Sequence, residues 1–228
     1  MANKGSNRHL KRLAAPLYFD LERKTSTYAA KPDPGRHSLD TCISLLHLVE
    51  KLGLAKNSYE AKKIIKGGYI KINNMPIRKP KYPVGLGDVV SIKDGKSHAI
   101  SIDEIGHVAY GEQGKESIGL HYKVVDKYKI GGNKLVIRLH DGRNMALDEK
   151  LKNIHIGDTV VLDESRGVAE VISLREGSNC FIMGGAHIGG FGKILSIKKG
   201  SMHSKPIAVV QQNNSSFETS LKNLIVVG

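Results

Sequence analysis

The stretch that decides the fold is NSYEAKKIIKGGYIKIN, residues 57–73. Its first half predicts a helix over Ser58–Lys66, because Ala61, Ile64 and Ile65 fall on one apolar face and Gly67 follows as a stop. Asn57 or Ser58 offers the N-cap at its start. After the two glycines, apolar and polar side chains alternate, which is typical of a short strand. The pattern predicts a small α+β unit.

The opposite face of this helix is basic. Three ammonium groups and a phenol fall on one stripe, at positions i, i+3, i+4 and i+7. They are Tyr59, Lys62, Lys63 and Lys66. Glu60 is the only acid in the helix, whereas a solvated helix held by ion pairs alternates its charges. The stripe therefore predicts a surface that binds a polyanion.

The unit extends outward from this helix over residues 39–96. An earlier helix is predicted from Leu39 onward, with Asp40 as its cap and Gly53 as its stop. After the strand, residues 75–83 predict a loop rich in proline and basic side chains, and residues 87–92 predict a closing strand. The unit has no room for a βαβ cofactor fold.

Charge is distributed unevenly over the 228 residues. The chain has 35 Lys+Arg and 22 Asp+Glu, a formal net charge of +13. Residues 51–96 carry 11 basic and 3 acidic side chains, whereas residues 97–170 carry 10 and 12. Such a basic chain favours nucleic acid as its partner, with an anionic membrane surface as the weaker candidate. The acidic balance of residues 97–170 argues against a main phosphate-binding role for them.

Several classes of protein are excluded by composition. At 40% apolar and 25% charged residues, the chain is globular, and no apolar run is long enough to span a bilayer. No secretory signal is visible, and the two distant cysteines make no disulfide framework, so we expect a cytoplasmic protein. Trp is absent and Phe is rare, which disfavours a sequence-reading, base-stacking protein.

Residues 1–38 predict an extended basic arm. No apolar period persists there, and three of the seven prolines fall in the segment. The first acid is Asp20, after five basic side chains that we take as candidate contacts. They are Lys4, Arg8, His9, Lys11 and Arg12. Such an arm would order on a polyanion, and the alternative is a terminus that stays unstructured.

The rest of the chain predicts two β domains, over residues 97–170 and 171–228. Residues 135–147 predict a hairpin around Asp141 and Gly142, and residues 157–162 a further strand. The last domain shows five short strands, at residues 171–174, 180–183, 192–197, 207–210 and 224–227, enough for a small barrel. Whether the central domain faces solvent or a basic neighbouring protein stays open.

A glycine-rich string, GGAHIGGFGKI, fills residues 184–194. It fails the phosphate-loop pattern, because His187 stands at the required glycine and Ile194 replaces the hydroxyl. It fails the dinucleotide pattern as well, because Leu195 stands at the third glycine. The string instead predicts a tight turn between strands, which lets another backbone approach closely. That backbone could be RNA, or the turn could be purely structural.

Taken together, these segments resemble one family, the archaeal and eukaryotic (e-type) small-subunit ribosomal protein number four. The arm string from Gly5 to Pro16 and residues 35–39 match its opening. Residues 42–92 are similar to the RNA-binding domain shared with bacterial ribosomal protein four, and residues 184–194 look like a KOW turn of an SH3-like barrel. The end of the chain, without a basic extension, resembles archaeal members.

The resemblance implies an α+β, multi-module structural constituent of the small ribosomal subunit. Its partners would be small-subunit rRNA and neighbouring ribosomal proteins, with no cofactor, no membrane and no homo-oligomer. Further candidate RNA contacts follow in the helix pair, the loop after it and the glycine turn. They are Lys51, Lys71, Arg78, Lys79, Lys81, Gly185, His187, Gly189 and Lys193.

An enzyme is not predicted. The ten histidines and two cysteines form no metal-ligand or nucleophile spacing. The alternative to a ribosomal constituent is a free RNA-binding or elongation factor built from the same modules. Presence or absence in the small-subunit peak of a sucrose gradient distinguishes the two.

Overall fold

The computed structural model describes residues 9–92, 97–112, 120–131, 134–147, 153–163, 167–198, 200–201, 204–212 and 215–227. Two α-helices occur in this part of the chain, α1 (Leu45–Lys51) and α2 (Ser58–Lys66). The bounds of α2 agree with the prediction, since Asn57 caps it by accepting a hydrogen bond from the Glu60 amide at 2.9 Å. Neither helix is long and apolar enough to cross a membrane.

The first helix is shorter than its sequence pattern predicts. Leu39–Thr41 forms a 3-10 turn and Cys42–Ser44 forms strand β3, so α1 begins at Leu45 and Asp40 does not cap it. The reason is a pairing with a distant segment, because β3 lies antiparallel to β6 (Pro83–Gly85) with Ile43 opposite Val84. The predicted stop is correct, since Gly53 follows the helix with a φ of 70°.

A five-stranded sheet packs beside the helix pair. Its order is β5 (Met75–Pro76), β4 (Ile70–Ile72), β7 (Val89–Ile92), β8 (Ser97–Ile102) and β9 (Val108–Glu112), all antiparallel. The predicted strand over residues 87–92 is therefore present, but it does not close the sheet. Strands β8 and β9 continue it across the boundary expected at residue 96.

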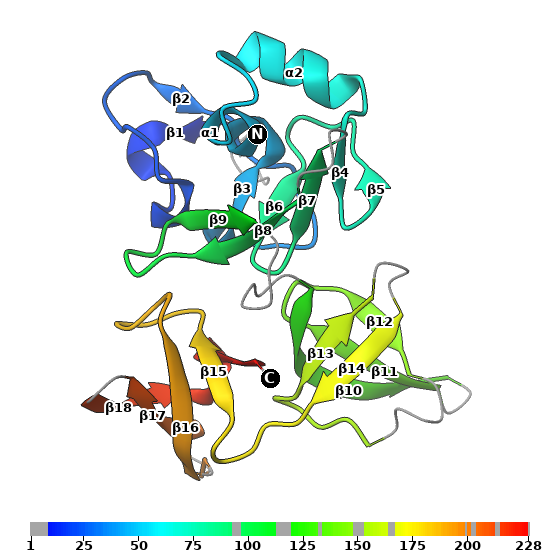
Figure 1. Ribbon diagram of the computed structural model, residues 1–228, viewed down its shortest axis with the longest axis vertical. Helices are drawn as coiled ribbons and strands as arrows, with labels where there is room; N and C mark the ends of the chain where they lie inside the picture. The colour runs from blue at the N-terminus through cyan, green and yellow to red at the C-terminus, as the bar shows by residue number, and fades with distance from the viewer. Residues whose placement is uncertain are drawn as a thin grey trace, which may run out of the picture.

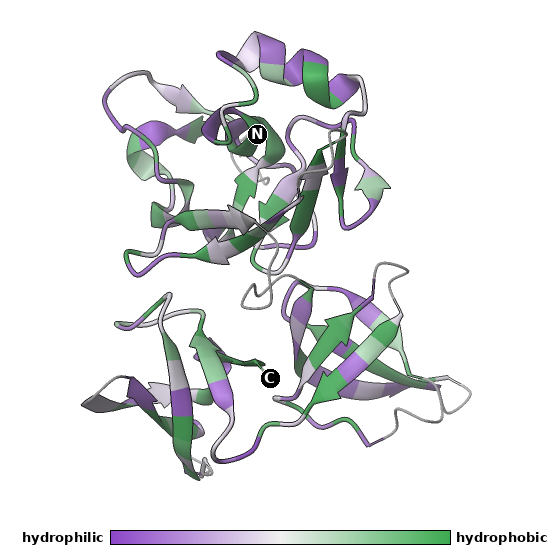
Figure 2. Ribbon diagram, in the orientation of Figure 1, coloured by the Kyte–Doolittle hydropathy of each residue, from purple (hydrophilic) through white to green (hydrophobic). Residues whose placement is uncertain are grey.

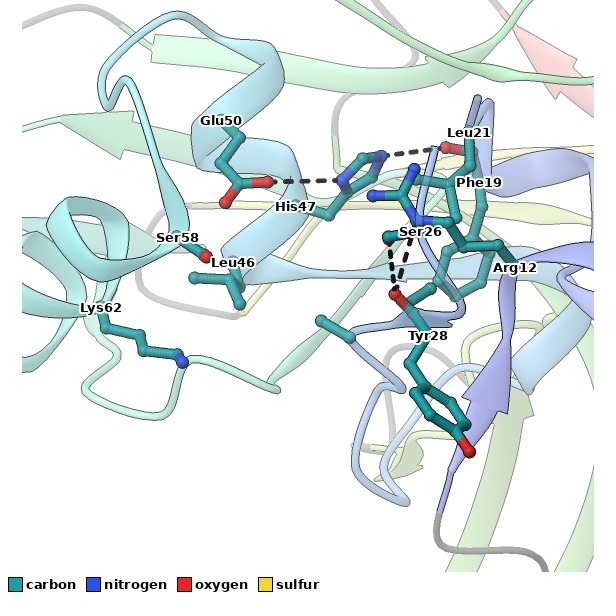
Figure 3. Close-up of a pocket in the computed structure, with 12 residues that line it drawn as sticks. Arg12, Phe19, Leu21, Ser26, Tyr28, Leu46, His47, Glu50, Ser58 and Lys62 are labelled. Carbon is teal, nitrogen blue, oxygen red and sulfur yellow. Dashed lines mark hydrogen bonds and ion pairs between the residues drawn. The ribbon is translucent and has the colours of Figure 1, made fainter. Parts of the chain in front are cut away.

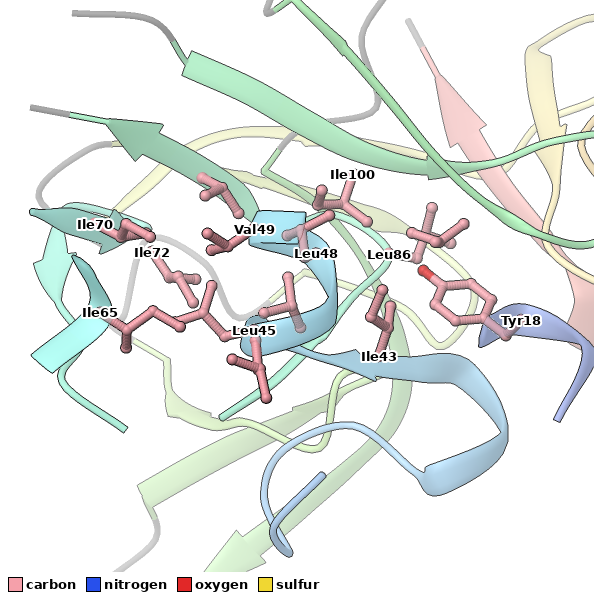
Figure 4. Close-up of a cluster of buried hydrophobic side chains, with 14 of the residues drawn as sticks. Tyr18, Ile43, Leu45, Leu48, Val49, Ile65, Ile70, Ile72, Leu86 and Ile100 are labelled. Carbon is pink, nitrogen blue, oxygen red and sulfur yellow. The ribbon is translucent and has the colours of Figure 1, made fainter. Parts of the chain in front are cut away.

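The largest hydrophobic core lies between these helices and this sheet (Figure 4). Leu45 and Leu48 of α1 meet Ile70 of β4 and Ile100 of β8, all fully buried. Tyr18, from the N-terminal segment, is 4% exposed and belongs to the same cluster. The N-terminal segment was expected to extend away from the rest of the chain, but it contributes to this core.

The expectation of an extended arm is wrong for residues 9–38. Strand β1 (Leu10–Lys11) pairs with β2 (Tyr28–Ala29), and 3-10 turns form at Arg12–Ala14 and Leu17–Phe19. Leu10, Ala15 and Phe19 make a small core of their own. Irregular 3-10 turns bury apolar residues without a helical or strand period, so no period appears in the sequence. Lys4 and Arg8 lie outside the described residues.

Two further five-stranded antiparallel sheets follow, and Figure 1 shows them side by side beneath the helix-bearing part. The middle sheet has the order β12 (Asn144–Ala146), β11 (Lys134–Leu139), β10 (His121–Ile130), β13 (Thr159–Leu162) and β14 (Val168–Ile172). The predicted hairpin is present as β11 and β12. The middle sheet encloses its own core around Tyr122 and Ile137.

The last sheet has the order β18 (Ser215–Ser220), β17 (Ile207–Gln212), β16 (Phe191–Lys198), β15 (Asn179–Ile182) and β19 (Leu224–Val227). Four of its strands correspond to predicted ones. The strand predicted at residues 171–174 instead pairs within the middle sheet as the end of β14, and β18 is polar and was missed. Overall the chain is α+β and consists mostly of strands.

Polar contacts join the middle and last sheets. Lys123 of β10 is buried, and its Nζ donates to the carbonyls of Leu221, Lys222 and Leu224. The Val226 amide donates to Thr159 Oγ1 at 3.1 Å. Because Lys123, Thr159 and Val226 are buried, these bonds satisfy polar groups withdrawn from water and fix the C-terminal strand β19 against the middle sheet.

Candidate nucleic-acid interface

The stripe on α2 is exposed as predicted by its spacing. The side chains of Tyr59, Lys62, Lys63 and Lys66 are all exposed, Tyr59 by 79%, while Ala61 and Ile65 are buried on the opposite face. Figure 2 shows hydrophilic and hydrophobic segments alternating along this helix. The acid of the helix is used internally, since Glu60 Oε2 accepts a hydrogen bond from the Lys56 amide at 2.9 Å. The stripe thus carries three ammonium groups with no acid between them.

Basic residues after the helix extend this surface. Gly68 follows α2 with a φ of 76°, and a Cβ placed there would lie 3.4 Å from Arg78 Nε. Arg78 therefore lies against the end of α2, next to the stripe. Lys71, on β4, and Lys79 and Lys81, in the loop before β6, are exposed as well. We refer to the α2 stripe and these four basic residues as the basic face.

Two of the predicted contacts have partners within the chain. The Arg12 guanidinium donates to the carbonyl of Glu22 and to Thr25 Oγ1, both at 2.8 Å, and so closes the loop between β1 and β2. Lys51 forms an ion pair with Asp20. This ammonium lowers the pKa of the Asp20 carboxyl. Arg12 and Lys51 therefore serve the internal structure, whereas His9 and Lys11 are exposed on the N-terminal segment.

The glycine-rich turn connects β15 to β16 and packs on the chain itself. Gly189 has a φ of 80°, and a Cβ there would lie 2.3 Å from the carbonyl carbon of Asp103. A Cβ placed at Gly106, in the same β8–β9 turn, would lie 3.7 Å from Cδ1 of the neighbouring Ile188. The backbone that approaches Gly189 is thus protein, so the structural alternative holds at this position, and we withdraw Gly189 as an RNA contact.

The other residues predicted from this turn remain accessible. His187 is exposed and stacks on Phe217 with 3.7 Å between ring centroids. Gly185 is exposed with a φ of 101°, and Lys193 is exposed on β16. They lie on the last sheet and are separate in the fold from the α2 stripe.

Sequence reasoning missed a buried ionic network between the first and middle sheets. The Asp88 carboxylate is fully buried and accepts hydrogen bonds from His37 Nε2 at 2.9 Å and from Asn73 Nδ2 at 2.7 Å. The Arg36 guanidinium lies 3.4 Å from the Asp88 carboxylate and 3.6 Å from the carboxylate of Asp141, which lies between β11 and β12 of the middle sheet. Arg143, from the β11–β12 hairpin, forms an ion pair with Asp141 and donates to Tyr122 Oη.

The network fixes the charge of Asp88. Burial alone would raise the pKa of this carboxyl, but the hydrogen bond and charge of His37, with the charge of Arg36, lower it to about 2. Arg36 and Arg143 therefore neutralise buried acids and are not part of a phosphate-binding surface. The sequence gives no sign of this network, because Asp88 and Asp141 come close only when the first and middle sheets pack against each other.

The described residues contain no cluster of His, Cys, Asp and Glu that could hold a metal ion. The polar constellations found are ion pairs and hydrogen bonds that hold the chain together. What distinguishes the surface is the basic face, which lies on α2, on β4 and in the loop before β6.

Comparison with known proteins identifies these segments. Residues 4–40 match the model of the RS4NT (NUC023) domain, and residues 45–90 match the model of the S4 domain. The small ribosomal subunit protein eS4 of Methanococcus vannielii is 35% identical, over 100% of this chain and 97% of that protein. The chain belongs to the eS4 family. The resemblance seen in the sequence is confirmed.

More distant members agree with this assignment. The eS4 protein of Staphylothermus marinus is 32% identical over 100% of this chain and 95% of its own length. The crystal structure of the 30S ribosomal protein S4e from Thermoplasma acidophilum has a TM-score of 0.68 and 26% identity, and covers 83% of this chain. The match to an eS4-family structure supports the overall arrangement of helices and sheets.

Proposed function

We propose that this eS4-family chain is a structural constituent of the small ribosomal subunit and binds rRNA mainly through its basic face. The relatives are named as small-subunit ribosomal proteins, not as enzymes or free factors. The chain therefore acts in translation, in the cytoplasmic small ribosomal subunit. Its partners are rRNA and neighbouring ribosomal proteins. We propose in addition that it is not a homo-oligomer.

The observation that carries the RNA-binding surface is the exposure of the α2 stripe inside the matched S4 domain. Three ammonium groups within two helical turns, with the nearby acid engaged at the N-terminus of the helix, attract phosphates and release counterions. Such contacts read the shape of folded RNA with little dependence on base sequence.

The remaining contacts are proposed with weaker roles. His9 and Lys11 would extend the surface along the N-terminal segment, together with Lys4 and Arg8. Gly185, His187 and Lys193 would touch a second RNA segment. We propose that the last sheet is an SH3-like barrel with a KOW turn, because the glycine string joins two neighbouring antiparallel strands. The domains would be the folded N-terminal segment, the helix-pair unit, the central domain and this barrel, with β8 and β9 assigned to the helix-pair unit.

The basic face is tested by removing the stripe. We expect Lys62→Ala/Lys63→Ala/Lys66→Ala to weaken rRNA binding and to flatten the plot of log affinity against log salt by roughly 2 to 3. The matched control is Lys129→Ala/Lys134→Ala/Lys205→Ala, which removes three exposed ammonium groups elsewhere. A slope unchanged in the first variant would remove α2 from the interface.

The ribosomal role is tested by sedimenting a cell lysate through a sucrose gradient. We expect the chain in the small-subunit peak at one copy per 30S-type particle. Its absence from that peak, with the chain found at the top of the gradient, would instead identify a free RNA-binding factor.

A further inference from the structure

The cavity beside Lys62 has partners within the chain for its carboxylate and its guanidinium. It has a volume of about 310 Å³ and lies between the N-terminal segment and the helix pair (Figure 3). The Glu50 carboxylate is ion-paired with His47, and the Arg12 guanidinium is engaged in the loop between β1 and β2. These contacts hold the N-terminal segment and the helices in place.

A larger groove, of about 510 Å³, borders the part of the basic face that follows α2. It forms where residues 33–36 of the N-terminal segment meet residues 76–83, which run from β5 to β6. Arg78 and Lys79, both exposed members of the basic face, line it, so the groove continues that face. We call it the proline groove, because three of its lining residues are Pro34, Pro76 and Pro83.

The two walls of the proline groove are held together by contacts within the chain. The Asp33 amide donates to a carbonyl of the opposite wall at 2.7 Å. A Cβ placed at Gly35 would lie 2.5 Å from Pro83 Cγ, so the walls touch at this point. The Tyr82 hydroxyl accepts a hydrogen bond from Arg36 at 3.0 Å, and proline rings restrict the backbone on both sides. A site formed in advance loses little conformational entropy when a ligand binds.

The surface of the groove combines rings with cations. The half-buried Tyr82 lies beside proline rings, and the Arg36 guanidinium lies over the tyrosine ring, 5.9 Å from its centroid. The charge of Arg36 is balanced by the two buried acids of the ionic network. Arg78 and Lys79 therefore supply the charge that is available to a ligand, against Asp33 as the one acid of the lining.

This surface fits a ligand that is flat and apolar at one end and negatively charged at the other. A free phosphate would make no use of the rings, and an apolar peptide would make no use of the cations. A nucleotide has both parts, and the basic face around the groove already favours RNA. The base must be unpaired, because bases inside an RNA helix are stacked and paired. Packing of rings on a base is tolerant of base identity.

We propose that the proline groove receives one unpaired nucleotide of the bound RNA. Its base packs against Tyr82 and the proline rings, and its phosphate contacts Arg78 and Lys79. Phosphates of the adjoining RNA helix lie on the α2 stripe. This inference rests on the proposed RNA-binding function and adds to it a preference for RNA with an unpaired base, whichever base it is.

The test uses the full chain and fluorescein-labelled RNA hairpins that differ at one position. One hairpin is fully paired, two carry a bulged uridine or a bulged adenosine, and the last carries an abasic bulge that keeps the sugar and phosphate. We expect the two bulged bases to bind alike and about tenfold more tightly than the abasic bulge. Tyr82→Leu should reduce this preference. The control Tyr128→Leu, which removes a half-buried tyrosine from β10, should keep it.

A cross-linking experiment on the unmodified chain locates the bulged base without any variant. With 4-thiouridine in the bulge, light should join the base to residues 33–36 or 76–83. Cross-links confined to other segments would overturn the groove as the site, as would a preference that survives in a folded Tyr82→Leu chain.

The outcomes separate this proposal from the proposed function. Equal affinity for the paired, bulged and abasic hairpins would overturn the nucleotide site while leaving RNA binding intact, and would leave the groove to an acidic protein segment. Failure of every hairpin and of rRNA to bind would overturn the proposed function itself.

Discussion

Replacing Gly189 by alanine tests whether the glycine turn exists to pack on protein. Two costs are expected at this position. A left-handed backbone costs an L-residue about 1–2 kcal/mol. The new Cβ would also lie 2.3 Å from both the carbonyl carbon and the oxygen of Asp103. Both atoms belong to backbone, so relief requires the turn to move, and overpacking of this kind costs about 1–3 kcal/mol more. The free energy of unfolding should fall by about 2–5 kcal/mol.

Gly177 provides a matched control for this experiment. Its φ is 86°, and nothing lies within 4 Å of a Cβ placed there. Gly177→Ala should therefore show the backbone cost alone, about 1–2 kcal/mol. Urea unfolding followed by circular dichroism measures both variants. Equal losses of stability in the two would refute the close packing of the turn on the β8–β9 turn, and Gly189 would again be available to RNA.

Two further predictions concern stability. Because the pKa of Asp88 is about 2 when folded and 3.8 in the free group, the carboxylate stabilises the fold above pH 4, and this contribution is lost as the pH falls through 2. The free energy of unfolding, measured in urea titrations, should fall by about 2 kcal/mol between pH 5 and pH 2 for this reason. Asp88→Asn should remove this part of the pH dependence. An identical pH profile in the variant would exclude Asp88 as its source. Asn57→Ala should cost about 1 kcal/mol of unfolding free energy by removing the cap of α2, and no loss would show that the cap is replaced.

The sequence predicted α2 well because every signal for it is local. Its cap, apolar face and terminal glycine all lie between Asn57 and Gly67, so the signals for the helix do not depend on a distant segment. The first helix was predicted too long because β3 pairs with β6, about forty residues away. Local periodicity from Cys42 onward was consistent with a helix, but the ladder with Pro83–Gly85 decides the conformation.

The candidate interface shows the same division between local and distant effects. The α2 stripe could be predicted, since helical spacing alone places its side chains together. The contacts of Arg12 and Lys51 within the chain could not be predicted, because their partners depend on how the N-terminal segment folds back. The glycine turn was correctly placed between strands, but only the packed structure shows that Asp103 is the backbone that approaches Gly189.

The net charge of +13 therefore overstates the surface available to RNA. Arg36 and Arg143 neutralise buried acids, Lys123 donates to backbone carbonyls, and Arg12 closes a loop. Exposed cations concentrate on α2 and the loop after it. Because Arg12 and Phe19 also form a wall of the cavity beside Lys62, the N-terminal segment shapes the surface that the helices present. We therefore propose that the RS4NT and S4 segments form one RNA-binding surface, on which the exposed cations concentrate in the S4 segment.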